Sequence, residues 1–196
     1  MECQEHDGKP ETFAEDMDMK RNNIVLVGFM GTGKSTVSRL LADKLDGWTA
    51  VDTDLLIEER EAMTIPDIFA KYGEAHFRRT ESRVIAEVTS RMRQVIATGG
   101  GAVLDPGNRE RMLAGGFVVA LTAAMETIIR RVRSDENRPL LHGNVEERVK
   151  NLLEARKNAY DFADIKIDTT DLTADEVAET ILRARAKLLS LPTDAG

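Results

Sequence analysis

The chain has 196 residues, of which 42% are hydrophobic and 31% charged, and a formal net charge of −7. This size and composition are ordinary for one globular domain with a single core. No apolar run approaches the roughly 18 residues of a membrane-spanning helix, and the single Cys3 excludes an internal disulfide and a cysteine-rich metal site.

The charge is concentrated at the N-terminus. Residues 1–20 hold seven acids, two lysines and few apolar residues, so we expect a disordered acidic tail there. Residues 21–190 are expected to form one domain and 191–196 a C-terminal tail. The nearly neutral body does not suggest a nucleic-acid surface. An acidic N-terminus without a basic-then-apolar signal pattern predicts a cytoplasmic protein that does not act at a membrane.

The predicted elements alternate between strands and helices. Apolar runs predict strands at 23–28, 49–54, 94–98, 117–122 and 165–169. Helical spacing predicts helices at 34–45, on both sides of Gly73, and at 106–114, 124–133, 145 to about 162 and 174–189, the last with a Thr173/Glu176 capping box. Residues 134–144 have no periodicity and are interpreted as a mobile loop. Such alternation is typical of a three-layer α/β fold with parallel strands joined by right-handed crossovers.

The first strand leads into a phosphate-binding motif. Residues 28–35 read GFMGTGKS, the G-x-x-x-x-G-K-[ST] pattern, in the expected position between a strand and a helix. Its backbone N–H groups and the helix start would surround phosphates. Lys34 would reach the β- and γ-phosphates, and the Ser35 hydroxyl would bind Mg²⁺. A chance glycine-rich turn is the alternative.

Two acids follow the second strand. In open parallel sheets ligands bind outside the carboxyl ends of strands, which places Asp52 and Asp54 at the same cleft as the phosphate loop. One acid can hold Mg²⁺ through water, and the other can accept a proton from an attacking hydroxyl. The alternative is structural, because Thr53 or Asp54 could cap the helix that follows.

Three glycines, Gly99, Gly100 and Gly101, follow the third strand. A triplet is costly in conformational entropy unless something approaches the backbone closely, so we interpret it as a bare backbone wall for a flat, hydroxylated ligand. A flexible turn is the alternative. Among the arginines, Arg78 and Arg156 could grip an anionic acceptor, and Arg138 could close over the phosphates from the 134–144 loop. Each could equally be a solvated surface residue.

Together these motifs resemble the shikimate kinase family. GFMGTGKST, DTD, FRRTES, TGGGAV, RPLL and ARKNAY occur in that family's order and spacing, from about Asn22 to Leu189. The family's proline after the position of Arg156 is absent, although Arg156 and Tyr160 keep their places. The resemblance implies a P-loop kinase fold with a five-stranded sheet of order 2-3-1-4-5 and a mobile lid. The implied reaction is transfer of the ATP γ-phosphoryl group to the 3-hydroxyl of shikimate, in the pathway to chorismate and aromatic amino acids.

The resemblance also implies residue roles. ATP would bind to Gly31, Thr32, Gly33, Lys34, Ser35, Thr36, Arg131 and Arg138, with Arg131 against adenine. Mg²⁺ would bind Ser35 and, through water, Asp52. Shikimate would contact Asp54, Arg78, Gly99, Gly100, Gly101 and Arg156. Asp54 would be the base, assisted in catalysis by Lys34 and by Arg138 from the lid, and Glu81 would orient Arg78.

Two alternatives remain open from the sequence. One is another small-molecule kinase of the same fold, such as a gluconate kinase, which would share the phosphate loop but not the other motifs. The second is a nucleotide-binding regulatory domain without transferase activity, against which the intact Lys34, Ser35, Asp54 and Arg138 argue. We expect a monomer whose partner is a small-molecule substrate.

Overall fold

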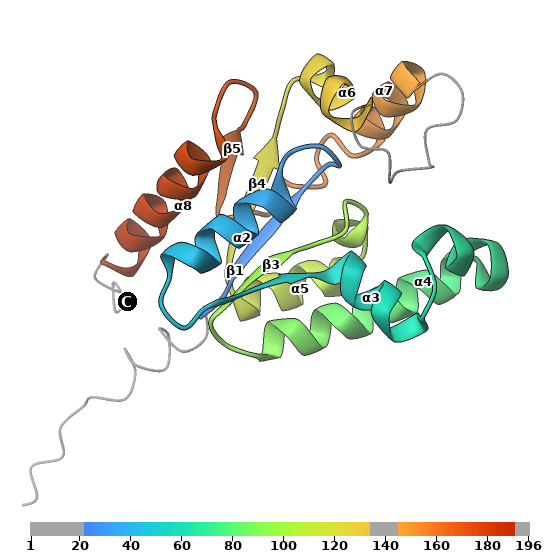
Figure 1. The fold of residues 1–196 in the computed structure, drawn as a ribbon, viewed down its shortest axis with the longest axis horizontal. Coiled ribbons are helices and arrows are strands. Elements are labelled where there is room, and N and C mark those ends of the chain that lie inside the picture. Colours follow the sequence, from blue (N-terminus) through green and yellow to red (C-terminus); the bar gives the residue numbers. More distant parts are fainter. Residues whose placement is uncertain (1–21, 134–144, 191–196) are drawn as a thin grey trace, which may run out of the picture.

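The computed structural model describes residues 22–133 and 145–190. Within them, five parallel strands form one sheet in the order β2-β3-β1-β4-β5, and helices cover both of its faces (Figure 1). The predicted α/β class and strand order are confirmed. The acidic tail at 1–20, the 134–144 loop with Arg138, and the C-terminal tail at 191–196 lie outside the described residues.

The elements alternate along the chain as expected. They are β1 (Ile24–Gly28), α2 (Lys34–Lys44), β2 (Thr49–Asp52), α3 (Thr53–Glu61), α4 (Ile65–Ser90), β3 (Gln94–Ala97), the 3-10 turn η1 (Ala102–Leu104), α5 (Pro106–Gly115), β4 (Phe117–Thr122), α6 (Met125–Arg133), α7 (Val145–Ala155), β5 (Ile165–Asp168) and α8 (Ala174–Leu189). Helix α4 is kinked at Gly73, whose φ is 78°. No helix in the two described ranges is both long and apolar enough to cross a bilayer.

The sheet is buried on both faces because the central strands β1, β3 and β4 are apolar at nearly every position, with Gln94 and Thr122 at their ends. On β1, Val25 and Val27 pack with residues of α4 and α5 in one core cluster. Ile24 and Leu26 face the opposite way and pack against α2 and α8, which lie next to each other in Figure 1. This period-two division fixes the strand register and therefore the level at which each strand ends.

Two predicted boundaries differ from the structure by more than one residue. The second strand ends at Asp52, not at residue 54, because the Asp52 side chain accepts the backbone N–H groups of Asp54 and Leu55 and starts α3 there. The helix predicted to reach about residue 162 ends at Ala155. After it the backbone continues in tight turns, in which Ala159 N–H donates to Arg156 O, and Tyr160 enters the core.

Candidate active site

The phosphate-binding loop lies between β1 and α2. Gly33 is the N-cap of α2 with φ of 95°, a left-handed conformation that disfavours any residue with a side chain. Lys34 is 9% exposed, and its Nζ donates to the carbonyls of Gly28 and Phe29, at 2.9 Å each. The ammonium is therefore folded over the loop, where an arriving phosphate can replace carbonyl oxygens as its partner.

Ser35, at the start of α2, and Asp52, at the end of β2, are hydrogen-bonded to each other. The Ser35 hydroxyl donates to Asp52 Oδ2 at 2.7 Å. Two oxygen ligands so placed suit a hard cation, and Mg²⁺ in phosphoryl-transfer sites takes one or two protein oxygens with substrate phosphates and water. In the described residues no group of three or more His, Cys, Asp or Glu side chains is arranged as a metal site. The donor set thus fits a Mg²⁺ ion that arrives with a nucleotide.

The capping residue of α3 is Asp52, not the predicted alternatives Thr53 or Asp54. Its Oδ1 accepts the Asp54 N–H at 3.1 Å, while Oδ2 accepts from Ser35. Asp54 stands in the first turn of the helix, half-buried. Thr53 is buried, and its hydroxyl accepts the Gly99 N–H at 3.1 Å. This bond ties the end of β2 to the glycine triplet after β3.

A pocket of about 420 Å³ opens over the phosphate loop. All of the described residues predicted to bind ATP line it, namely Gly31 to Thr36 and Arg131. The Arg131 guanidinium donates to Gly31 O at 3.3 Å and to Thr169 O at 2.8 Å. Thr169 and Leu172, which follow β5, also line the pocket and were missed, although the strand-end rule applies to β5 as to the other strands.

Arg78 pairs with two carboxylates from its own helix. Its Nη1 lies 2.8 Å from Glu81 Oε2, the contact that the family resemblance implies, and its Nη2 lies 3.3 Å from Glu74 Oε1. Burial alone would lower the pKa of Arg78, but the two ion pairs outweigh it and the pKa is raised. Burial raises the pKa of Glu81, whose side chain is 2% exposed, despite the opposing effect of Arg78. The pair holds the guanidinium at the carboxyl end of the sheet.

Arg156 approaches from the turns after α7. Its Nη1 donates to Gly100 O at 3.2 Å, and its guanidinium carbon lies 5.7 Å from the centre of the Phe29 ring. Tyr160 donates to the same Gly100 carbonyl at 3.0 Å. Segments almost 60 residues apart are therefore joined at the glycine triplet.

The surroundings of Gly99 and Gly101 explain why side chains are absent at these two positions. None of the three glycines has the positive φ that would require glycine, so the backbone conformation is not the reason. A Cβ at Gly99 would lie 2.6 Å from Asp54 Oδ1 and 2.9 Å from Glu81 Oε1, and one at Gly101 would lie 2.9 Å from both Arg78 Nη atoms. One at Gly100 would meet its nearest neighbours at 3.5 to 3.6 Å, an ordinary contact. The triplet is packed against predicted functional groups and is not merely a flexible turn.

The three alanine variants of the triplet are predicted to differ. Gly99→Ala displaces the ends of Asp54 and Glu81 and should lower kcat. Gly101→Ala displaces the Arg78 guanidinium and should mainly raise the KM for the acceptor. Gly100→Ala is expected to fold normally and bind the acceptor poorly, because the new methyl group occupies the wall itself. Steady-state kinetics and Tm of the three variants check this; equal effects on both constants in all three would contradict it.

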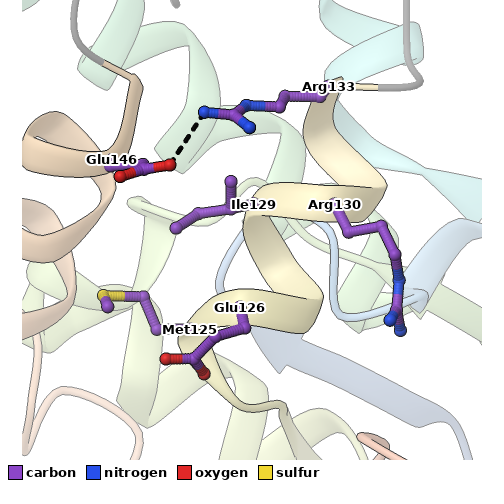
Figure 2. Close-up of a pocket in the computed structure, with 6 residues that line it drawn as sticks. All are labelled: Met125, Glu126, Ile129, Arg130, Arg133 and Glu146. Carbon is purple, nitrogen blue, oxygen red and sulfur yellow. Dashed lines mark hydrogen bonds and ion pairs between the residues drawn. The ribbon is translucent and has the colours of Figure 1, made fainter.

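A larger hollow, about 640 Å³, lies between α6 and α7. It is lined by Met125, Glu126, Ile129, Arg130, Arg133 and Glu146, and an ion pair of 2.9 Å joins Arg133 to Glu146 (Figure 2). None of the described residues that were predicted to bind a substrate lines it. The structure therefore brings Asp54, Arg78, Gly99–Gly101 and Arg156 together beside the phosphate loop and not at this larger hollow.

Comparison with known proteins identifies the family of the chain. The family described as shikimate kinase matches residues 30–186. A shikimate kinase from Thermodesulfovibrio yellowstonii is 47% identical over 167 residues, covering 85% of this chain and 96% of the relative. The solved structure of a shikimate kinase from Acinetobacter baumannii in complex with shikimate superimposes with a TM-score of 0.82 at 40% identity, covering 90% of this chain and 99% of the other.

The gluconate kinase alternative receives support only at the level of the fold. A gluconokinase from Sinorhizobium meliloti superimposes with a TM-score of 0.57 at 17% identity, over 87% of this chain and 94% of the other. A likeness that distant reflects the shared arrangement of sheet and helices, not the acceptor. The family match and the much higher identity over nearly the same length decide between the two: the chain belongs to the shikimate kinase family.

Proposed function

We propose that this ATP-dependent kinase transfers the γ-phosphoryl group of ATP to the 3-hydroxyl of shikimate. The observation that carries the proposal is the convergence of Asp54, Arg78 and Arg156 on the glycine triplet, next to the phosphate loop. Two guanidinium groups beside one carboxylate suit an acceptor that has both an acid group and a reacting hydroxyl.

On the donor side, Lys34 leaves its carbonyl partners for the β- and γ-phosphates, and Arg131 lies against the adenine. Ser35 would bind Mg²⁺ directly, and Asp52 would bind it through water. When bound, Mg²⁺ neutralises charge that develops on the phosphate oxygens. The 2.7 Å hydrogen bond between Ser35 Oγ and Asp52 Oδ2 supports this assignment because it places the two oxygens close enough to serve the same ion.

On the acceptor side, Arg78 and Arg156 hold the shikimate carboxylate, and the triplet forms the wall behind its ring. Asp54 takes the proton of the 3-hydroxyl as that oxygen forms a bond to the γ-phosphorus, and the bond from the γ-phosphorus to the bridging oxygen breaks to release ADP. Arg138, outside the described residues, is assigned to the transferring phosphoryl group. The assigned set needs no residue from a second copy, and we propose a monomeric enzyme.

The proposal is tested by finding which phosphoryl acceptor supports ADP release. ADP release should depend on shikimate and on added Mg²⁺, and should stay at the ATPase background with gluconate or AMP. A coupled ADP assay with each acceptor in turn measures this. Turnover with gluconate instead would establish the alternative kinase, and no turnover with any acceptor, in protein whose ATP binding is intact, would favour a regulatory domain.

A further inference from the structure

One backbone carbonyl in the acceptor site accepts two side-chain donors. Gly100 O is bonded by Arg156 Nη1 at 3.2 Å and by the Tyr160 hydroxyl at 3.0 Å. A carbonyl oxygen has two lone pairs, so it can satisfy both. The two donors differ in what else they must do, because Arg156 is assigned to the substrate carboxylate whereas Tyr160 has no assigned part in the reaction.

Tyr160 is fixed where it stands. It is 7% exposed and belongs to the same core cluster as Phe77, Ala102 and Val103. Burial raises the pKa of its hydroxyl, although Arg156 opposes the rise, so the group stays protonated and remains a donor at neutral pH. Arg156, by contrast, is half-buried and begins a series of turns, a position from which its guanidinium can change partners.

The charge on each hydrogen-bond acceptor determines which partner the Arg156 guanidinium prefers. A guanidinium bonds more strongly to a carboxylate than to a neutral carbonyl, so an arriving carboxylate draws Arg156 N–H groups away from Gly100 O. A partly buried carbonyl left without a donor would cost part of the binding free energy. Tyr160 prevents this loss because its own hydroxyl still donates to the carbonyl once Arg156, which is also hydrogen-bonded to that hydroxyl, has turned away.

We propose that Tyr160 is a positioning residue for acceptor binding: its hydroxyl keeps the Gly100 carbonyl bonded, and the glycine wall in place, while Arg156 turns to the substrate carboxylate. This inference rests on the proposed function, since it needs an anionic acceptor held by Arg156. It differs from a packing role, in which only the aromatic ring of Tyr160 matters.

Tyr160→Phe separates the two roles because it keeps the ring and removes the hydroxyl. We expect the shikimate KM, and the Kd from calorimetry without ATP, to rise about 5- to 10-fold, the effect of one neutral hydrogen bond. The kcat and the KM for ATP should change less than about twofold, and the Tm by no more than about 4 °C. Tyr72→Phe is the matched control. Tyr72 is the other of the two tyrosines in the sequence and is 45% exposed, so this variant should leave every constant unchanged.

Arg156→Lys provides a second comparison. In that background Tyr160→Phe should have a smaller effect on the shikimate Kd than in the wild type, because the two residues act at the same carbonyl. An unchanged shikimate Kd in Tyr160→Phe, or a large fall in Tm with Kd unchanged, overturns the proposal and leaves packing as the role. Failure of the proposed function is distinguishable, because then the wild-type protein itself would not bind shikimate.

Discussion

Replacing Asp54 with asparagine is expected to lower kcat with shikimate by about 10²- to 10⁴-fold, the usual contribution of a positioned general base. Asparagine has the same shape but cannot take the hydroxyl proton. The N-cap of α3 belongs to Asp52, so the helix that carries residue 54 should remain intact. Steady-state kinetics, together with the Kd for ATP by calorimetry, measures the separation between chemistry and nucleotide binding.

The control for this variant is Asp43→Asn, an acid-to-amide change at an exposed position of α2. It should leave kcat and both substrate constants at wild-type values. If ATP binding collapsed in Asp54→Asn, the residue would be structural and the base would have to be sought elsewhere.

Replacing Arg78 with alanine is expected to raise the shikimate KM by about 30- to 1,000-fold, which corresponds to about 2 to 4 kcal/mol for a charge-assisted carboxylate pair in a desolvated site. The effect on the KM for ATP should be small, since Arg78 lies in α4 and not in the nucleotide pocket. Arg79→Ala, the next residue of the same helix and exposed, is the matched control. Equal shikimate constants in the two variants would remove Arg78 from the acceptor site.

The same variant has a pH-dependent cost in stability. Without Arg78 the buried Glu81 carboxylate loses its partner, and unfolding at neutral pH should become easier by about 1 to 3 kcal/mol. The pKa of Glu81 is already raised by burial and would rise further without its cation. A carboxyl whose pKa is raised in the folded state destabilises that state at pH values above this pKa and not at pH values below it. The loss of stability in the variant relative to wild type should therefore shrink as the pH falls through the pKa of Glu81 in the folded state. Urea unfolding of both proteins across this pH range measures the difference.

The sequence predicts the phosphate loop well because the residues of the loop are contiguous, whereas Arg131 was placed only by the family resemblance. The phosphate loop needs only a strand, a glycine-rich turn and a helix in succession, and all three have local signatures. The rule that ligands gather at strand ends also places Asp52, Asp54 and the glycine triplet in one region, and the structure joins them through Thr53 and Gly99. The Arg78–Glu81 pair was implied by the resemblance to the shikimate kinase family, and its i,i+3 spacing on one helix permits it.

Contacts between distant segments could not be predicted in the same way. Nothing near Tyr160 indicates that its hydroxyl reaches a carbonyl 60 residues earlier, and Leu172 has no motif that assigns it to the nucleotide pocket. The predicted ends of two elements were wrong for a related reason. Periodicity does not show whether a strand ends at Asp52 or two residues later, because the outcome depends on a side-chain cap that forms only once the backbone turns. The predicted helix beyond Ala155 failed because tertiary packing of Tyr160 outweighs local helical spacing.

The two hydrogen-bonded oxygens of Asp52 limit where residues can be inserted in the chain. Its carboxylate caps α3 through one oxygen and meets Ser35 through the other, so residue 54 stands at a fixed angle around the helix axis. One inserted residue between them would rotate the next side chain by about 100° and advance it by about 1.5 Å, turning it away from Gly99. Insertions should be tolerated more readily in an exposed connection, such as the one between α2 and β2 at Asp46 and Gly47, than here, where the separation of the two acids sets the position of the proposed base.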